Sequence, residues 1–324
     1  MAHTKNDILT ILGVSIKPGE RKEANFDVAN LHTSTPVNVP VIIERSKKPG
    51  PIVLFTAGIH GDEVNGVEIV RQLIAKGINK PKCGTIICIP VINVFGFINL
   101  KREFPDGRDL NRVFPGSKDG SLASRVAYKL VHEIIPHVEY IIDFHTGGSG
   151  RFNAPQLRYS KGNRIPNDLA KVFGAPFVLY SKNLSKSFRT ICYKLGKPLL
   201  LFEGGKSFHI DDVITNSGVN GSKRILHHLG MLSSKFKVSA PKNNCVFINE
   251  SKWIRANYSG MFKASITIGV QVTKGDILGN ITDPYGKFNY FVKAQNNGYI
   301  INVNESPIVY QGDALFRITT NIKT

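Results

Sequence analysis

Two histidines and a glutamate stand out as residues that could hold a metal ion. His60 and Glu63 lie three positions apart in GIHGDE, and His145 ends the apolar run YIIDFH. Imidazole nitrogens and carboxylate oxygens are good zinc donors, and a catalytic zinc usually takes three protein ligands and keeps one position for water. We therefore predict one metal site here. Asp143 precedes His145 by two residues on the same face of a strand, so it could orient that ligand.

Each candidate also has a purely structural interpretation. A His-x-x-Glu spacing arises by chance in surface loops, and a single histidine is more often a satisfied interior group than a ligand. Glu203, which ends PLLLFE, could cap a loop or pair with Lys206. Arg112 could form an ion pair with Asp106 or Asp109, as charged loop residues often do.

Apolar runs and amphipathic segments alternate around these residues. The pattern predicts strands at 51–57, 85–93, 140–145, 176–180 and 198–203, and helices within 67–77 and 121–134. Such alternation implies a largely parallel or mixed sheet with helices on both faces. Ligands bind beyond the carboxyl ends of the strands in such sheets. We therefore expect the polar residues that end these runs to converge on one rim: His60, Asn93, His145 and Glu203.

The character of the sequence changes near residue 233. The segment SSKFKVSAPKNN is polar and rich in lysine, and the short strand-like pieces after it are separated by glycines. We predict a larger domain at 1–235, a linker at 236–249 and a small all-β domain at 250–324. The fragments VTKGDILG and VKAQNNGYIINV resemble barrel-sandwich modules that carry lipoyl or biotinyl groups, but no lysine stands next to Met or Asp at a hairpin tip. We expect a structural or gating role for this domain.

Composition narrows the class of protein. The apolar fraction of 42% and the charged fraction of 20% are those of a globular protein. The four cysteines form no Cys-x-x-Cys pair, so neither a disulfide framework nor a cysteine zinc site is indicated. No apolar stretch is long enough to cross a membrane and no leader is recognisable, so we expect a cytoplasmic protein without a membrane partner.

The net charge of +18 agrees with anionic partners. Because the basic residues are scattered and no RNA-binding motif interleaves them with aromatic residues, we expect no nucleic-acid partner. A small anionic substrate fits the charge better. Whether the chain forms a homo-oligomer is left open by the sequence.

Five motifs in one order give the sequence a family resemblance. They are GIHGDE, PVINVFGF, RxxPDGRDLNRVFPG, DFHTG and LFEGG, and they span the larger predicted domain. This series resembles the succinylglutamate desuccinylase and aspartoacylase family. The resemblance implies a zinc-carboxypeptidase-like α/β fold, a mixed sheet with helices on both faces, to which the small C-terminal barrel-sandwich-like domain is added.

The resemblance also implies roles for individual residues. His60, Glu63 and His145 match the ligands of one zinc ion per chain, and Glu203 matches the catalytic carboxylate that activates water. Arg102 matches the arginine that polarises the scissile carbonyl. The residues that match substrate-binding positions are Asn111, Arg112 and, in a looser alignment, Arg189.

The implied activity is zinc-dependent hydrolysis of the amide bond in an acidic N-acyl amino acid or a related N-acyl amine, which is a non-peptide carbon–nitrogen bond. A zinc peptidase acting on a peptide terminus is the alternative within the same fold. A non-catalytic binding protein is the alternative from another class. Intact candidate ligands and an intact Glu203 favour the enzyme. The acyl group cannot be named from the sequence, because loops such as 149–165 and the C-terminal domain are expected to form the pocket walls.

Overall fold

The computed structural model describes residues 8–159, 167–241 and 244–323. The first strands are β1 (Leu9–Ile11), β2 (Val14–Ile16), β3 (Arg21–Asn30), β4 (Pro36–Arg45) and β5 (Ile52–Ala57). An alternating region follows, with α1 (Val64–Ala75), β6 (Thr85–Ile89), α2 (Val94–Asn99), α3 (Leu122–Lys129), β7 (Tyr140–Gly147), β8 (Arg151–Tyr159), α4 (Asn167–Phe173), β9 (Phe177–Tyr180), α5 (Phe188–Lys194), β10 (Leu199–Lys206) and α6 (Asp212–His228). Short helical turns lie at Leu110–Arg112, Leu130–Ile134 and Ile135–His137. The chain ends in β11 (Val246–Arg255), β12 (Gly260–Ala264), β13 (Gln271–Val272), β14 (Ile277–Thr282), β15 (Asn289–Lys293), β16 (Gly298–Asn304), β17 (Ile308–Val309) and β18 (Ala314–Lys323).

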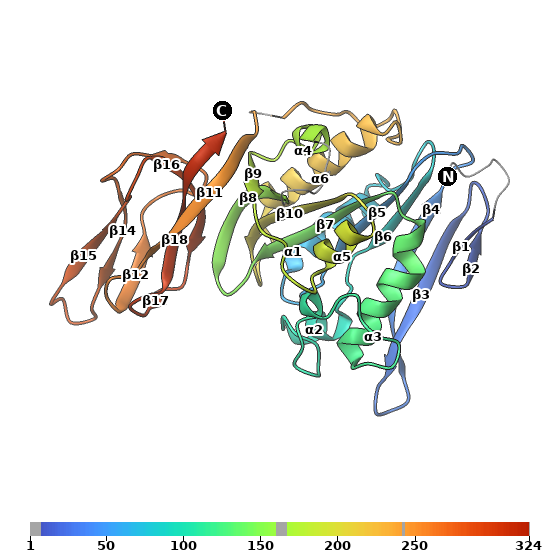
Figure 1. Cartoon of the computed structure of the whole chain (residues 1–324), viewed down its shortest axis with the longest axis horizontal. Coiled ribbons are helices and arrows are strands. Elements are labelled where there is room, and N and C mark those ends of the chain that lie inside the picture. The colour runs from blue at the N-terminus through green and yellow to red at the C-terminus, as the bar shows by residue number, and fades with distance from the viewer. Residues whose placement is uncertain (1–7, 160–166, 242–243, 324) are drawn as a thin grey trace.

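One large sheet runs through the molecule (Figure 1). Among the described residues it holds twelve strands in the order β13-β16-β18-β11-β9-β8-β10-β7-β5-β6-β4-β3. Its centre is parallel, since β5 pairs with β6 and β7, and β7 pairs with β10 in the same direction. The pairs β3–β4, β4–β6 and β8–β10 are antiparallel. The predicted mixed α/β sheet is thus confirmed, and its parallel strands bring their carboxyl ends to one rim.

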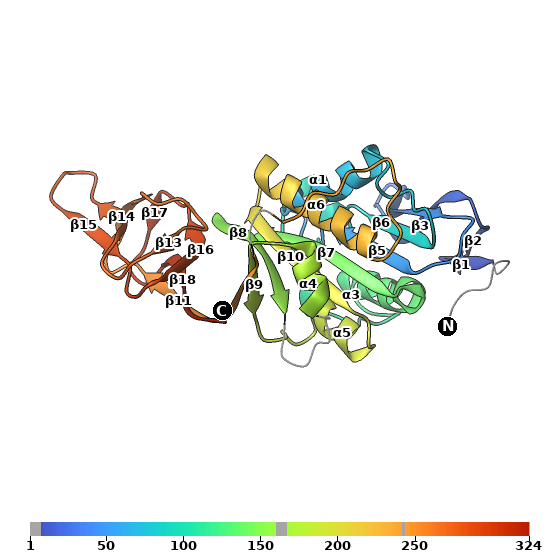
Figure 2. The same ribbon diagram turned by 90° about the horizontal axis from the view of Figure 1, so that it is seen from above.

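Helices cover both faces of this sheet because successive side chains of a strand point to opposite faces. All six residues of β5 are buried. Leu54 packs in the core that α3 and α5 cover, whereas its neighbours Val53 and Phe55 pack in the core that α1 and α6 cover. Figure 2 shows α1 and α6 on one side of the sheet and α3 and α5 on the other. Burial on both faces explains why the strand reads as an uninterrupted apolar run.

Strand β8 corrects the expectation of a loop at 149–165, because residues 151–159 are a strand. Pro155 and several polar residues conceal it in the sequence. The proline is tolerated because it lies between the paired segments of β8. Strand β9 pairs with residues 156–159, β16 pairs with residues 151–153, and the register against β10 shifts between Glu203 and Gly205. The missing N–H therefore falls at an interruption of the hydrogen-bonded ladder. Residues 160–166 lie outside the described residues.

The elements after α6 are all strands, and they are joined to the large sheet by backbone pairing. β11 pairs with β9, and β16 pairs with β8. Strands β12, β14, β15 and β17 form a second sheet that packs over β16 and β18 around Phe262, Leu278 and Phe316. Figure 1 shows this group at one end of the molecule, beside β8 and β9.

The predicted linker at 236–249 overlaps the start of β11. Residues 246–249 are the first residues of this strand, and pairing with β9 satisfies backbone groups there. The polar, lysine-rich sequence before them hid the strand. The division into a hydrolase domain and a small β domain, and its barrel-sandwich likeness, remain predictions.

Two expectations from composition can be compared with the structure. All four cysteines are free thiols in the structure. Within the described ranges, the helices are too short or too polar to cross a membrane.

Candidate metal centre and active site

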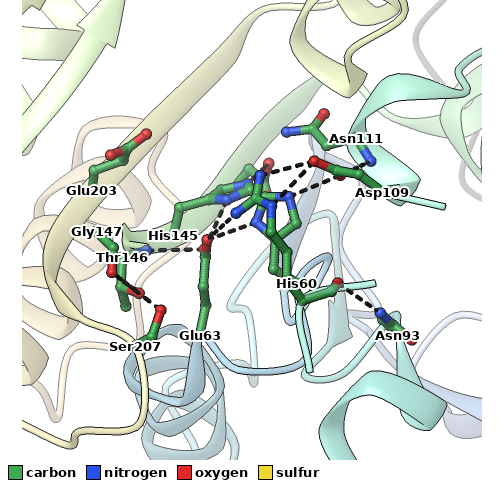
Figure 3. A network of polar contacts seen from close by, with 12 residues as sticks. His60, Glu63, Asn93, Asp109, Asn111, His145, Thr146, Gly147, Glu203 and Ser207 are labelled. Carbon is green, nitrogen blue, oxygen red and sulfur yellow. Dashed lines mark hydrogen bonds and ion pairs between the residues drawn. The ribbon is translucent and has the colours of Figure 1, made fainter. Parts of the chain in front are cut away.

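The structure brings His60, Glu63 and His145 together at the carboxyl ends of β5 and β7 (Figure 3). Glu63 lies between the two imidazoles. Its Oε1 atom is 2.7 Å from Nδ1 of His60, and its Oε2 atom is 3.0 Å from Nδ1 of His145. All three residues are buried, and one potential ligand atom from each lies within 4.8 Å of the others. The three predicted ligands therefore form one compact donor group.

Carboxylates hold the outer nitrogens of both histidines. Nε2 of His60 is 3.1 Å from Oδ1 of Asp109, and Nε2 of His145 is 2.9 Å from Oδ2 of Asp143. Asp143 is itself fixed, because the Thr56 hydroxyl donates to its Oδ1 at 2.8 Å. With Nε2 donating to a carboxylate, each ring directs Nδ1 toward the shared centre, which is the usual orientation of a histidine metal ligand. Two imidazoles, one carboxylate and such outer partners suit a zinc ion.

Close backbone packing positions the loop that carries His60. A Cβ atom on Gly61 would lie 1.9 Å from the carbonyl carbon of Gly96, so only glycine allows the loop to meet α2 this closely. Asn93 ties the same region together. Its backbone N–H donates to Gly58 at 2.7 Å, and its side chain caps α2 by accepting from the N–H of Gly96 at 2.8 Å.

The electrostatics of the group agree with its geometry. Burial alone lowers the pKa of His145, but the carboxylates of Asp143 and Glu63 outweigh it and raise that pKa well above its usual value. Burial likewise opposes charge on Glu63, yet the two histidines hold its pKa well below its usual value. The pKa of His60 is raised because Glu63 and Asp109 outweigh the effect of burial. The buried site therefore already favours the ionised carboxylate that a cation requires.

Glu203 lies on β10 directly opposite His145 on β7, so the two side chains share one face of the sheet. Its Oε2 atom accepts from Nδ2 of Asn153 at 2.8 Å and is 2.7 Å from Nη2 of Arg158. Lys206, which the sequence offered as a structural partner, pairs with Glu305 at 2.7 Å instead. Glu203 is therefore not part of a loop ion pair with Lys206.

Arg102 lies between the donor group and Asp109. Its Nε and Nη2 atoms donate to Oδ2 of Asp109 at 3.2 and 2.9 Å, and Nη1 donates to Oε1 of Glu63 at 3.3 Å. Asp109 therefore pairs with Arg102 and His60, and the ion pair with Arg112 that the sequence allowed is absent from the described residues. The guanidinium stands at the edge of the donor group, where it lines a cavity.

The three predicted substrate-binding residues line the same cavity. Asn111 accepts a hydrogen bond from the backbone N–H of Phe188 at 2.8 Å, which joins its loop to α5. Arg112 is exposed and donates to the carbonyl of Asn111 at 2.7 Å. Arg189 is buried and donates to the Ser181 hydroxyl at 2.8 Å and to the carbonyl of Lys182 at 2.9 Å.

The cavity has a volume of about 520 Å³, and part of its wall comes from the C-terminal strands. These strands contribute Trp253, Asn302 and Arg317. The guanidinium carbons of Arg151 and Arg317 lie 5.9 and 5.8 Å from the Trp253 ring centre, within the range of cation–π contacts. The C-terminal strands thus form part of the candidate active site.

Arg158, Arg189 and Arg317 form an arginine cluster around Glu203. Only Arg158 makes an ion pair with a carboxylate among the described residues, and that partner is Glu203. Burial lowers the pKa of Arg189 and of Arg317 to about 10 in each case, and the charge on Arg158 adds to this. The cluster holds more positive charge than Glu203 neutralises, so it suits an anionic ligand.

Sequence reasoning did not assign a role in the site to several of these residues. Asp109 was considered only as a loop ion-pair partner. Arg158 and Asn153 lie in the segment that we interpreted as a loop, and Arg317 and Asn302 lie in strands of the C-terminal region. A signal existed only for Asp109, which stands in the motif DLNR beside predicted site residues. The others are brought near Glu203 only by strand pairing.

Fold and site together define an α/β protein with a candidate metal site at the carboxyl rim of a mixed sheet. A model of the succinylglutamate desuccinylase/aspartoacylase catalytic domain matches residues 49–229, which is more than half of the chain. The chain therefore belongs to this family, whose members are amide hydrolases.

Individual relatives support the same assignment. The chain is 27% identical over 259 residues to the N-alpha-acetyl-L-2,4-diaminobutyric acid deacetylase of Halomonas elongata, and the match covers 76% of this chain and 75% of that protein. The product-bound ectoine utilization protein EutE (DoeB) from Ruegeria pomeroyi has a TM-score of 0.81 at 21% identity, with 93% and 95% of the two chains covered. The succinylglutamate desuccinylase/aspartoacylase from Rhodobacter sphaeroides has a TM-score of 0.78 at 21% identity, with 94% and 96% covered. At these identities the likeness to the solved structures concerns the fold.

Proposed function

We propose that this protein is a zinc-dependent amidohydrolase that cleaves an acidic N-acyl amino acid or a related N-acyl amine. The observation that supports this most is the buried group of His60, Glu63 and His145, in which carboxylates hold both histidines by their outer nitrogens. One zinc ion per chain would be held by these three residues. Bound there, zinc supplies Lewis acidity, which acidifies water and polarises a carbonyl group.

Glu203 is the proposed acid and base of the reaction. Its Oε2 atom is engaged by Asn153 and Arg158, and within the described part of the chain Oε1 accepts no hydrogen bond. Oε1 is therefore the oxygen that would take a proton from the attacking water and later pass it to the leaving amine. A positioned acid or base of this kind usually contributes roughly a hundredfold to ten-thousandfold in rate.

Arg102 is the proposed electrophilic residue. Asp109 fixes its Nε and Nη2 atoms, so its charge stays at the edge of the donor group. It would stabilise the negative charge that develops on the carbonyl oxygen during attack.

The proposed substrate is small and anionic. A cavity of about 520 Å³ lies within the usual range for small-molecule sites. Asn111 and Arg112 at the wall would bind a substrate carboxylate, because the planar guanidinium can grip both of its oxygens. The arginine cluster adds further positive charge to the same cavity. The Halomonas relative is named for an N-acetylated diamino acid, so N-acetyl amino acids belong in the substrate panel beside N-succinyl amino acids.

The decisive experiment combines metal analysis with release of primary amine from a panel of N-acetyl and N-succinyl amino acids. We expect about one zinc per chain in the wild-type protein. Glu203→Gln should retain the metal, because Glu203 is not among the three proposed ligands, and should lose about 10²- to 10⁴-fold in kcat. The matched control is Glu250→Gln, which changes an exposed carboxylate on β11 and should leave both results unchanged.

Other outcomes would redirect the assignment. A metal-free and inactive wild-type protein would exclude the catalytic proposal and favour a binding protein. Zinc without turnover of any small substrate would favour a peptidase, and peptides with acidic termini would then be tested.

A further inference from the structure

A row of side chains crosses the sheet from the C-terminal strands to the candidate active site. Strand pairing places Trp253 of β11 opposite Arg317 of β18, Arg317 opposite Asn302 of β16, and Asn302 opposite Asn153 of β8. Side chains of paired residues on neighbouring strands lie on the same face of a sheet. The row thus connects the C-terminal strands to the strand that contacts Glu203.

Hydrogen bonds continue along this row to the proposed catalytic carboxylate. Nδ2 of Asn302 donates to Oδ1 of Asn153, and Nδ2 of Asn153 donates to Oε2 of Glu203 at 2.8 Å. The three residues are 6%, 2% and 9% exposed, so water does not readily replace these partners. The contact between Asn302 and Asn153 joins residues 149 positions apart in the sequence.

The direction of these bonds matters because an amide side chain has a donor end and an acceptor end. Asn153 can turn its donor toward Glu203 only while its oxygen faces away, and the amide group of Asn302 binds that oxygen. Without this partner, Asn153 is free to turn its oxygen toward the carboxylate, and the two acceptors would repel. Asn302 therefore selects the orientation of Asn153 that holds Glu203.

A second observation separates Asn302 from an ordinary packing residue. Its Oδ1 atom is buried and has no hydrogen-bond partner among the residues that the structure describes, and Asn302 lines the cavity. An unsatisfied buried acceptor is destabilising, so an amide that served only to join two strands would be unfavourable here. Asn304, two residues further along β16, is the opposite case. It donates to the carbonyl of Ala314 at 3.1 Å, accepts from the N–H of Ser306 at 2.9 Å, and does not line the cavity.

We propose that Asn302 is a positioning residue of the active site, which acts through Asn153 to hold the carboxylate of Glu203 in its working orientation. The C-terminal strands would then help to position the catalytic carboxylate, in addition to forming part of the cavity wall. This inference rests on the proposed function, because it assigns Glu203 the role of acid and base.

The test measures kcat and KM on the best substrate of the panel for Asn302→Ala, with Asn304→Ala as the matched control. Both substitutions remove a buried asparagine from the same strand, with exposures of 6% and 8%. We expect Asn302→Ala to lower kcat by roughly tenfold to a hundredfold, as residues that orient a catalytic group commonly do, with KM changed by less than about twofold. Asn304→Ala should lower the melting temperature and leave kcat unchanged.

Two further variants make the test specific. Asn302→Asp keeps the shape of the side chain but removes the donor, so it should lower kcat at least as far as Asn302→Ala even if the alanine variant folds poorly. In an Asn153→Ala background, Asn302→Ala should have no further effect on kcat, because its effect passes through Asn153.

Equal kcat values for Asn302→Ala, Asn302→Asp and Asn304→Ala would overturn the inference while leaving the proposed function intact. An undiminished effect of Asn302→Ala in the Asn153→Ala background would also overturn it. A wild-type protein that hydrolyses no substrate would instead remove the proposed function, and this inference with it.

Discussion

The donor group and the arginine cluster are neighbours in one cavity, but their charges are balanced differently. In the donor group, Glu63 contacts both histidines, and Asp109 and Asp143 hold their outer nitrogens. In the arginine cluster, Arg158 pairs with Glu203, whereas Arg189 and Arg317 contact only neutral groups among the described residues.

This difference suits the two regions to ligands of opposite charge. Three carboxylates, from Glu63, Asp109 and Asp143, contact the two imidazoles and the guanidinium of Arg102. When the imidazoles are neutral, this region carries net negative charge that suits a cation. Guanidinium groups outnumber the carboxylates in the cluster, so an anion completes it. A substrate with a carboxylate near its amide bond could therefore place the carboxylate beside the arginine cluster and the amide bond beside the donor group.

Removing a histidine from the donor group should have the largest effect. We expect His145→Ala to lose the stoichiometric zinc and to reduce amine release to background, because two donors remain where catalytic zinc takes three. Metal content and turnover are measured together. His228→Ala, at the exposed end of α6, is the control and should match the wild type. Full zinc occupancy of the His145→Ala protein would show that the metal binds elsewhere.

Weakening an outer carboxylate should have an intermediate effect. Asp143→Asn keeps the size of the side chain but removes the charge that orients His145, so we expect zinc affinity to fall roughly tenfold to a hundredfold. Competition with a chelator measures this affinity. Asp276→Asn, in an exposed turn of the C-terminal region, is the control. Unchanged affinity in Asp143→Asn would mean that Glu63 alone orients the histidine.

Removing one arginine from the cluster should have the smallest effect and should leave the metal in place. We expect Arg317→Gln to raise KM for the anionic substrate about tenfold, because one charge-assisted hydrogen bond is lost, while kcat changes by less than about twofold. Steady-state kinetics with and without added salt measure this. Arg255→Gln on the exposed side of β11 is the control. A fall in kcat at constant KM would contradict a role in substrate binding.

The central part of the fold could be predicted from the sequence because burial on both faces leaves a local signal. The apolar runs at 51–57, 85–93, 140–145, 176–180 and 198–203 each coincide with all or most of a strand of the sheet, and α1 and α3 overlap the segments where the helical spacing predicted helices. Polar strands gave no such signal. Pro155 and its polar neighbours concealed β8, and a lysine-rich segment concealed the start of β11.

The sequence by itself determined the donor group. His60 and Glu63 are three residues apart, and His145 follows a buried strand. Short-range spacing, the rule that parallel strands end at one rim and the family resemblance together indicated that these residues meet. The roles of these residues in metal binding and catalysis remain predictions that the experiments above address.

Only the tertiary structure decided the other half of the site. Asn153, Arg158, Asn302 and Arg317 are ordinary polar strand residues in the sequence. Asn153 and Arg158 contact Glu203 because β8 pairs with β10, and Asn302 and Arg317 lie beside them because β16 pairs with β8 and β18. Backbone pairing between distant strands leaves no short-range pattern, since the partner of each strand depends on the whole sheet. For this reason the sequence could predict the grouping of His60, Glu63 and His145 but not the residues that surround the proposed catalytic carboxylate.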